Sequence, residues 1–205
     1  MVRVALLDDH PAVLAGLRRL IEPEPDLTVV DGIGDPGRLM PLLDRTRPDV
    51  LVLDHDLARA DGLSHCLRVK RRERPPAVVV YVAYTSPALA LAARAAGADA
   101  LVDKADPVRR LLDAIRIAAE GGQVIPGAPQ DAYAAAVERV DDADLPVLAM
   151  LLDGTTVEDI AAALRSDPGE VAWRAQRIVG RLCPGLRQRP VEEPGSATPA
   201  ASRRG

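Results

Sequence analysis

The stretch DVLVLDHDL, residues 49–57, decides the fold of this chain. Residues 50–53 are all apolar, follow Pro48 and Asp49, and lead directly into Asp54. A short apolar run rich in β-branched residues, bounded by polar ones, predicts a buried strand of a parallel sheet. Asp54 is then expected at the carboxyl end of that strand, which is the edge where open α/β sheets bind ligands.

Strand-like runs and helical patterns alternate on both sides of this stretch. The predicted strands are residues 3–7, 27–33, 50–53, 77–84 and 100–102. Three of the helices that follow begin where Asp or Ser precedes Pro, which predicts Asp35, Ser86 and Asp106 as helix caps. Fivefold alternation of strand and helix predicts a flavodoxin-like α/β domain, with helices on both faces of a parallel sheet in the order 2-1-3-4-5.

The C-terminal part of the chain shows a different pattern. Only short helices are predicted there, at residues 145–152, 157–164 and 170–182, and Gly154 ends the first. Two short helices joined by a tight turn match a helix-turn-helix. We expect an α/β domain over residues 1–122, a linker over 123–140 whose Ala-rich end also suits a helix, a small all-α domain over 141–183, and a disordered tail over 184–205.

Composition indicates an ordinary globular protein. Of the 205 residues, 48% are hydrophobic and 27% charged, while aromatic residues make up only 2%, so Ala, Val, Leu and Ile must fill the cores. The chain has neither a long apolar run nor a signal-peptide layout, and we expect a cytoplasmic protein that does not enter a membrane. Cys66 and Cys183 lack metal-ligand spacing and are expected to be reduced.

Acidic residues and one lysine follow three of the predicted strands. Asp8 and Asp9 end the first strand, Asp54 ends the third, and Lys104 follows the fifth, so all should meet at one edge of the sheet. Three converging carboxylates repel one another unless a cation neutralises them, and Mg²⁺ suits such oxygen ligands. Asp54 could then attack a phosphoryl group while the metal and Lys104 balance its charge.

Three segments resemble the response regulators of two-component systems: LLDDHPAVLAGLRRLIE, DVLVLDHDLARADGL and AARAAGADALVDKAD. The chain length and the C-terminal helices resemble the NarL/LuxR subfamily. The resemblance implies a receiver domain in which Asp54 accepts phosphate and Lys104 contacts the phosphoryl group. It also implies that Asp9 binds Mg²⁺ directly, that Asp8 does so through water, and that the backbone carbonyl of Asp56 is a further ligand. A sensor histidine kinase, DNA and a second copy of the chain are the implied partners.

The receiver segment departs from the family pattern. Counting back from Gly97, the Ser or Thr expected at the end of the fourth strand falls on Val82, or on Ala83 after a slip of one residue. The Met-Pro that follows the phosphoacceptor in the family is replaced by Leu57 and Ala58. Two versions stay open: a receiver that switches on phosphorylation, and an atypical receiver that acts without it.

The last predicted helix resembles the DNA-reading helix of LuxR-type domains. Arg174, Arg177 and Arg181 share one strip of this helix, where they could meet phosphates or base edges; the alternative is a solvated face. Residues 125–183 contain 10 acids and 5 arginines, a net charge of -5. Since phosphate neutralisation dominates DNA affinity, this module should bind weakly as a monomer and need a homodimer, or another protein, to occupy a site.

The leading hypothesis is a DNA-binding transcriptional response regulator that is not an enzyme. An alternative is a Mg²⁺-dependent phosphohydrolase, because LVLDHDL resembles the motif of haloacid-dehalogenase-like phosphatases, with Asp54 as nucleophile and Asp56 as acid. In that family the motif lies on the first strand, whereas two whole strand–helix units precede Asp54 here. A third possibility is a signalling adaptor whose helices no longer read DNA.

Overall fold

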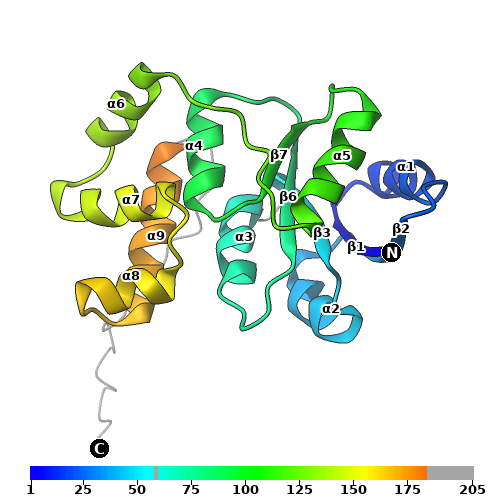
Figure 1. Cartoon of the computed structure of the whole chain (residues 1–205), viewed down its shortest axis with the longest axis horizontal. Coiled ribbons are helices and arrows are strands. Elements are labelled where there is room, and N and C mark those ends of the chain that lie inside the picture. The colour runs from blue at the N-terminus through cyan, green and yellow to red at the C-terminus, as the bar shows by residue number, and fades with distance from the viewer. Residues whose placement is uncertain (58–59, 184–205) are drawn as a thin grey trace, which may run out of the picture.

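Five parallel strands form the central sheet of the α/β domain, in a computed structural model that describes residues 1–57 and 60–183. The strands are β1 Val2–Leu7, β2 Leu27–Ile33, β3 Val50–Asp54, β6 Ala77–Val82 and β7 Ala100–Asp103. Their order, β2-β1-β3-β6-β7, is the predicted 2-1-3-4-5 order, and Figure 1 shows the sheet between its helices. The predicted tail, 184–205, and Ala58 lie outside the described residues.

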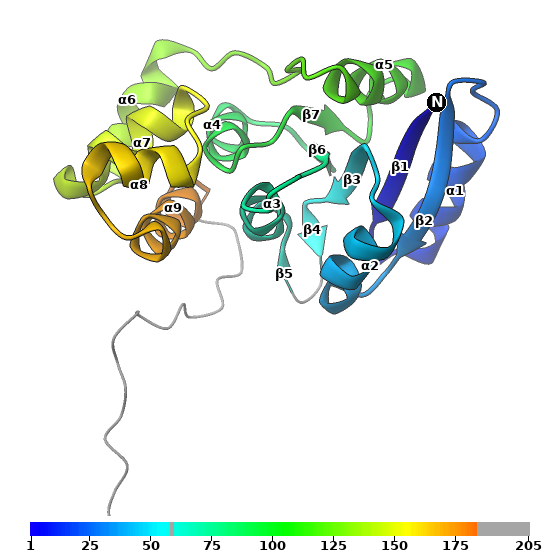
Figure 2. The same ribbon diagram turned by 60° about the horizontal axis from the view of Figure 1, so that its bottom comes forward.

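Alternate side chains of each strand enter two separate cores. Val4 and Leu6 of β1 pack on one face of the sheet, whereas Ala5 and Leu7 pack on the other. The first face is covered by α1 Pro11–Ile21 and α5 Val108–Ala119. The second face is covered by α2 Leu39–Thr46, α3 Gly62–Lys70 and α4 Pro87–Ala95. Figure 2 shows these helices on the two sides of the strands.

Two of the three predicted caps are confirmed and one is wrong. The side chain of Ser86 accepts a hydrogen bond from the backbone N–H of Leu89 and so caps α4. Asp35 caps a short 3-10 helix, η1 Pro36–Arg38, which precedes α2. Asp106 does not cap α5, because that helix begins one residue later, with Pro107 at the N-cap position.

The structure differs from the predicted strands in two places. Strand β6 ends at Val82 and not at residue 84, because the backbone beyond Val82 no longer pairs with a neighbouring strand. The backbone N–H of Thr85 instead donates a hydrogen bond to the Asp103 carboxylate at 3.0 Å. Directly after Asp54 the chain forms a short antiparallel hairpin, which the sequence did not indicate. Its strands are β4 Asp56–Leu57 and β5 Ala60–Asp61.

The C-terminal helices begin and end close to their predicted positions. They are α6 Gln130–Glu138, the 3-10 helix η2 Asp142–Asp144, α7 Leu145–Leu152, α8 Val157–Leu164 and α9 Pro168–Leu182. Gly154 follows α7 with φ +84°, a conformation that favours glycine, so it does end that helix as predicted. Thr156 caps α8, and Asp167 caps α9, which accounts for the sharp turns between the helices.

The C-terminal helices pack directly on the α/β domain. Helix α4 contacts α6, α7 and α9, and α3 also contacts α9 (Figures 1 and 2). The apolar core on the α3/α4 side of the sheet therefore continues into the C-terminal helices, where it includes Val147, Ile160 and Ile178. A continuous core of this kind places the third helix of the helix-turn-helix against the α/β domain.

The segment that joins the two parts of the chain is tied to the sheet. Val124 forms a parallel bridge with Ala100 of β7, and its carbonyl accepts a hydrogen bond from the N–H of Leu101 at 3.0 Å. The chain then crosses to α6, which lies within the stretch predicted as a linker. No described helix combines the length and the apolar character that crossing a bilayer requires.

Candidate functional site

Asp54 lies at the carboxyl edge of the sheet, next to two of its predicted partners. It ends β3 and its side chain is only 1% exposed. Lys104 follows β7, and its Nζ lies 2.9 Å from Asp54 Oδ1 and 3.0 Å from Asp8 Oδ2. Asp8, just after β1, is equally buried. Parallel strands with their carboxyl ends at one edge thus bring together residues that lie far apart in the sequence.

The backbone around Asp54 is tightly packed. The N–H of Asp56 donates to Asp54 Oδ1 at 3.2 Å, and the N–H of Gly62 donates to the carbonyl of His55 at 3.1 Å. A Cβ atom at Gly62 would lie 2.4 Å from the carbonyl oxygen of Asp54 and 2.7 Å from His55 Cα. Only glycine therefore allows the start of α3 to pass so close to Asp54.

The charges at this edge are only partly balanced. Burial raises the pKa of the Asp54 carboxyl above its usual value, while the hydrogen bond from Lys104 acts in the opposite direction. For Lys104, burial favours a lower pKa, but hydrogen bonds to Asp54 and Asp8 outweigh it and raise the pKa of the ammonium. Lys104 is therefore charged, and it pairs with two neighbouring carboxylates.

A divalent cation fits the residues at this edge. Asp8, Asp9, His10 and Asp54 each offer one ligand atom, and these atoms lie within 4.8 Å of one another. Asp54 Oδ2 is buried and has no hydrogen-bond partner among the described residues. A buried carboxylate oxygen without a partner is costly in free energy, and three carboxylates are the ligands that a hard cation prefers. The sequence pointed to the three acids; for His10, directly before Pro11, it favours a local structural role at the start of α1.

Val82 occupies the position at which the family pattern has a hydroxyl. It ends β6, pairs with Asp103 of β7, and is 1% exposed within the core on the α3/α4 side. Its carbonyl accepts a hydrogen bond from the N–H of Lys104 at 2.6 Å. The side chain has no group that could bind a phosphoryl oxygen, so the only polar contribution of Val82 to this edge is its backbone.

His55 lies apart from the acidic group. Its side chain is buried, and its Nδ1 lies 3.8 Å from Asp61 Oδ1. Asp61 caps α3, where it accepts hydrogen bonds from the N–H groups of Leu63 and Ser64. These contacts place His55 with the residues that support the start of α3.

The three arginines predicted to contact DNA are paired with acids of their own domain. Arg174 Nε lies 2.7 Å from Asp144 Oδ1, and Arg177 also binds Asp144, which is only 1% exposed. Arg181 lies 2.6 Å from Asp141 Oδ1. The side chains do share one strip, as their spacing indicates, but that strip faces η2 and the residue before it.

Much of the remaining surface of α9 is also covered. Residues 171–183 are buried or half-buried, whereas Glu170 and the residues just before it are exposed. Trp173 is half-buried beneath Arg177, whose guanidinium carbon lies 4.6 Å from the centre of its ring. Because α8 packs on one side of α9 and the α/β domain on the other, the start of this helix is its most open part.

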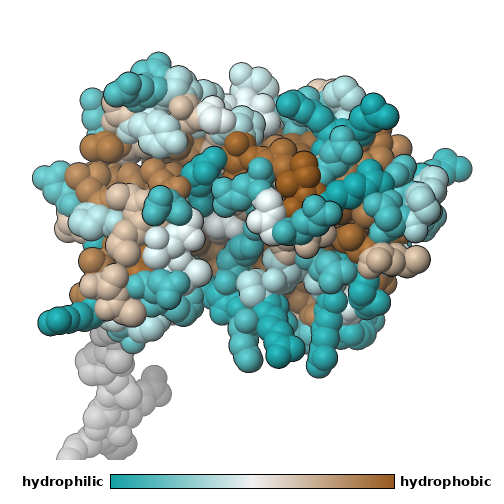
Figure 3. All heavy atoms as spheres, in the orientation of Figure 1, coloured by the Kyte–Doolittle hydropathy of each residue, from teal (hydrophilic) through white to brown (hydrophobic). Residues whose placement is uncertain are grey.

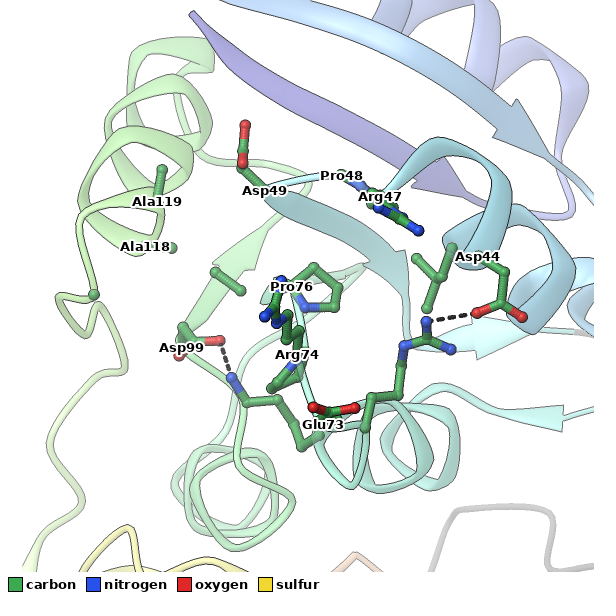
Figure 4. A pocket seen from close by; sticks show the side chains of 16 residues that line it. Asp44, Arg47, Pro48, Asp49, Glu73, Arg74, Pro76, Asp99, Ala118 and Ala119 are labelled. Atoms are coloured by element: carbon green, nitrogen blue, oxygen red, sulfur yellow. Dashed lines mark hydrogen bonds and ion pairs between the residues drawn. The ribbon is translucent and has the colours of Figure 1, made fainter.

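A second polar feature lies at the opposite, amino edge of the sheet. An open cavity of about 1110 Å³ lies there. Its lining includes Pro48, just before β3, and Pro76, just before β6 (Figure 4). An ion pair between Lys70 and Asp99, at 2.7 Å, closes part of its wall. Asp54 lies at the other end of β3, so this cavity takes no part in the acidic site.

Hydrophilic side chains gather near this edge, at the bottom of the face in Figure 3, around the turn that follows α3. Five basic residues are found between positions 68 and 74. Besides Lys70, two of them bind acids of other elements: Arg72 lies 2.6 Å from Asp44 of α2, and Arg71 lies 3.8 Å from Glu158 of α8. The Arg71–Glu158 pair joins the α/β domain to the helix-turn-helix.

Comparisons with known proteins agree with the geometry of the acidic site. Residues 4–116 match the family model of the response regulator receiver domain. A crystal structure of a LuxR-family two-component response regulator from Aurantimonas sp. SI85-9A1 is 32% identical, covers 69% of this chain and 99% of its own, and superposes with a TM-score of 0.58. The chain is a response regulator of the NarL/LuxR family.

Similarity to relatives of this response regulator extends beyond the receiver. The DNA-binding transcriptional activator DevR/DosR of Mycobacterium tuberculosis is 31% identical over 192 residues, which are 89% of this chain and 88% of that protein. The nitrate/nitrite response regulator protein NarP of Escherichia coli is 27% identical over 193 residues, or 88% of each chain. These relatives are regulators, and the phosphohydrolase alternative is not favoured.

Proposed function

We propose that this response regulator binds DNA as a homodimer in the cytoplasm and controls transcription, without being an enzyme. A sensor histidine kinase phosphorylates its receiver on Asp54 with the help of Mg²⁺. The observation that carries this proposal is the contact of Lys104 with both Asp54 and Asp8, at 2.9 and 3.0 Å, beside a buried oxygen of Asp54 that has no hydrogen-bond partner among the described residues. The division into receiver, linker and helix-turn-helix at residues 122 and 140 is part of the proposal.

Each residue at the carboxyl edge has a role in this phosphoryl transfer. A carboxylate oxygen of Asp54 forms the new bond to phosphorus as the bond to the donor breaks. The ammonium of Lys104, already held between two acids, stabilises charge on the transferring oxygens. Asp8 and Asp9, with Asp54, would hold Mg²⁺, which would supply further positive charge next to the phosphoryl group.

DNA binding requires a change in the position of the C-terminal domain. Helix α9 packs against α3 and α4, and residues 171–183 are buried or half-buried. A recognition helix must enter the major groove, which is wide enough for a helix but not for an adjoining domain. The docked arrangement is therefore the resting state, and the DNA-binding form has α9 separated from the receiver.

Phosphorylation is tested by intact mass after incubation of the full chain with Mg²⁺ and a small phosphodonor. The wild type should gain the mass of one phosphoryl group, and Asp54→Asn should gain none. Asp56→Asn is a matched control that removes a neighbouring, exposed carboxylate, and it should still be phosphorylated. If the wild type gains no mass, phosphorylation is not the signal and the receiver acts without it.

DNA binding is tested by selection of genomic fragments on the full chain, at low and moderate salt, with and without the phosphodonor. We expect enriched sites that the phosphodonor strengthens. Arg177→Ala should weaken their binding, because the guanidinium is the central cation of its strip, and the exposed receiver residue Arg38 provides the control Arg38→Ala. No enriched site in any condition would overturn the proposal of DNA binding.

A signalling adaptor is the second candidate, and one observation favours it. The arginines of α9 are already neutralised by Asp141 and Asp144, and residues 125–183 carry a net charge of -5. A surface of this kind has little attraction for DNA phosphates. If the protein is an adaptor, no DNA fragment should be enriched although the chain is phosphorylated normally. A DNA-binding regulator would instead show enriched fragments, so the two experiments together distinguish the two functions.

A further inference from the structure

A cavity of about 250 Å³ lies between the receiver and the helix-turn-helix. The receiver lines it near the ends of α3 and α4, with Arg71 and Arg94, and the helix-turn-helix lines it with the turn between α7 and α8, which includes Thr155 and Thr156. We propose that this cavity binds a small carboxylic acid with an apolar body, and that the bound acid holds the two domains in their docked arrangement. The effect on DNA binding rests on the proposed function, whereas the binding site does not.

The buried part of the lining is apolar and comes from both domains. The receiver contributes Leu67 of α3 and Ala95 of α4, and the helix-turn-helix contributes Leu151 of α7 and Val157 of α8. All four side chains are buried. At the packing density of protein interiors, a cavity of this volume holds about ten non-hydrogen atoms. The lining therefore suits a short alkyl chain or a single ring, which gains free energy by leaving water.

The polar part of the lining includes a cation that no acid balances. Lys70 is already paired with Asp99, at 2.7 Å. Arg94 is half-buried and forms no ion pair with the described residues; its Nη1 donates only a long hydrogen bond, at 3.4 Å, to the side-chain oxygen of Gln123. A guanidinium binds a carboxylate through two parallel hydrogen bonds. Arg94 is therefore the residue that we expect to bind the acid group of the ligand.

Two further features favour an anion in this cavity. Arg71 lies 3.8 Å from Glu158, a distance too long for a hydrogen bond, and both side chains are well exposed, so Arg71 is only loosely held. Helix α8 begins at the cavity with Val157 and Glu158, and the first N–H groups of a helix have no partner within it. This end of α8 adds positive potential, which helps to offset the charge of Glu158.

The cavity exists only while the two domains are docked, because each domain supplies part of its lining. A ligand shifts an equilibrium toward the state that it binds more tightly. The bound acid therefore opposes the separation of α9 from the receiver. The cavity also lies toward the amino edge of the sheet, since its lining includes Asp99, directly before β7. Asp54 lies at the carboxyl edge, so the ligand and the phosphoryl group act at different places.

The test measures the binding of benzoate and hexanoate to the full chain by calorimetry. These two probes distinguish an aromatic from an aliphatic body. At least one should bind with a Kd of about 0.1 to 1 mM, as expected for a ligand of about ten non-hydrogen atoms. Its amide, benzamide or hexanamide, has nearly the same shape without the charge and should bind about 10-fold or more weakly. Acetate, which lacks the apolar body, should show no binding at the same concentrations.

One variant and its control locate the acid group. Arg94→Gln should weaken binding of the acid by about 10-fold and change binding of the amide by less than about 2-fold. Arg109→Gln removes an exposed arginine of α5 that does not line the cavity, and it should bind the acid as the wild type does. In NMR spectra of the wild type, the acid should shift the N–H signals of Gly97 and Gly154, which line the cavity from the two domains.

Each other result has a definite meaning. The binding site is overturned if neither acid binds, if acid and amide bind equally, if Arg94→Gln binds the acid as the wild type does, or if only one domain shows shifted signals. At about 5 mM the acid should weaken binding of duplex DNA at low salt by about 5- to 10-fold relative to acetate. Unchanged DNA affinity with the acid bound would overturn its effect on docking. Absence of DNA binding before any acid is added would overturn the proposed function and leave the binding site intact.

Discussion

Arg181 of α9 lies 2.6 Å from the carboxylate of Asp141, the residue before η2. The hydrogen bond from Arg181 lowers the pKa of Asp141 below its usual value, so the pair stays charged at neutral pH. Arg177 also approaches Asp141, at 3.5 Å. One half-exposed acid thus holds two of the cations that the sequence assigned to DNA.

Replacement of Asp141 should strengthen DNA binding. In Asp141→Asn, Arg181 and Arg177 lose a competing anion, and we expect about 3- to 10-fold tighter binding of duplex DNA at low salt. Each freed guanidinium that reaches a phosphate should steepen the dependence of log K on log salt by about 0.9. Fluorescence anisotropy over a salt series measures both quantities.

Asp142→Asn is the matched control for this change. Asp142 is exposed, lies in η2, and forms no ion pair with the described residues, so its replacement alters net charge without freeing an arginine. If both variants gain affinity equally, general electrostatics and not the Arg181–Asp141 pair limits DNA binding.

Gly62→Ala should destabilise the receiver. The added Cβ would lie 2.4 Å from the carbonyl oxygen of Asp54, so the backbone must shift, at a cost of about 2 to 4 kcal/mol in the free energy of unfolding. Urea denaturation measures the change. Gly16 of α1 has open space around its Cβ position, and Gly16→Ala should be neutral or stabilise by up to about 1 kcal/mol. Equal stability of the two variants would contradict the close approach at Gly62.

Lys104→Met should destabilise the fold by leaving two buried carboxylates without their cation. Because the lysine is itself partly exposed, we expect a loss of about 2 kcal/mol, less than for a fully buried pair. Introducing Asp54→Asn into this variant should recover part of the loss, since one of the unpaired charges is removed. A double-mutant cycle in urea, without divalent ions, measures the coupling free energy between Lys104 and Asp54. Strict additivity of the two single-mutant effects would show that these residues are not coupled.

The ion pair between Arg116 and Asp26 should appear in an acid titration. A hydrogen bond from Arg116 lowers the pKa of Asp26 from 3.8 to about 2. The pair therefore stabilises the fold above about pH 4, and this contribution disappears as the pH falls toward 2. Carbon-detected NMR should give a midpoint near 2 for the wild type and near 4 for Arg116→Gln. Asp113 lies farther from Arg116, at 3.7 Å, so Asp113→Asn should leave the midpoint unchanged.

Cys66 should resist alkylation in the folded protein. It is fully buried, its thiol donates to the carbonyl of Ala96 at 3.4 Å, and burial raises its pKa to about 12. Since only the thiolate reacts, iodoacetamide at pH 8 should modify Cys66 only in denaturant. Peptide mass mapping distinguishes it from Cys183, which is less buried and should react first; fast native modification of Cys66 would show that α3 and α4 separate readily.

Much of the receiver was predictable from short patterns. Apolar runs that end in Asp8 and Asp54 specified strands, and in a parallel sheet the carboxyl ends of strands share one edge, so convergence with Lys104 followed from topology. Helix-stop and capping residues such as Gly154 and Ser86 predicted boundaries because they act on their own neighbours. These features depend on local chain geometry, which the sequence determines directly.

Other features were decided by tertiary contacts. A helical wheel placed Arg174, Arg177 and Arg181 on one strip, but it could not show that the strip faces Asp141 and Asp144. The covering of α9 by α3 and α4 depends on apolar surfaces that meet only after both domains have formed. By itself, therefore, the sequence determined the elements and the acidic edge, because these follow from periodicity and chain direction. Only the tertiary structure decided which faces of the helices are open to a partner, because that depends on packing between distant segments.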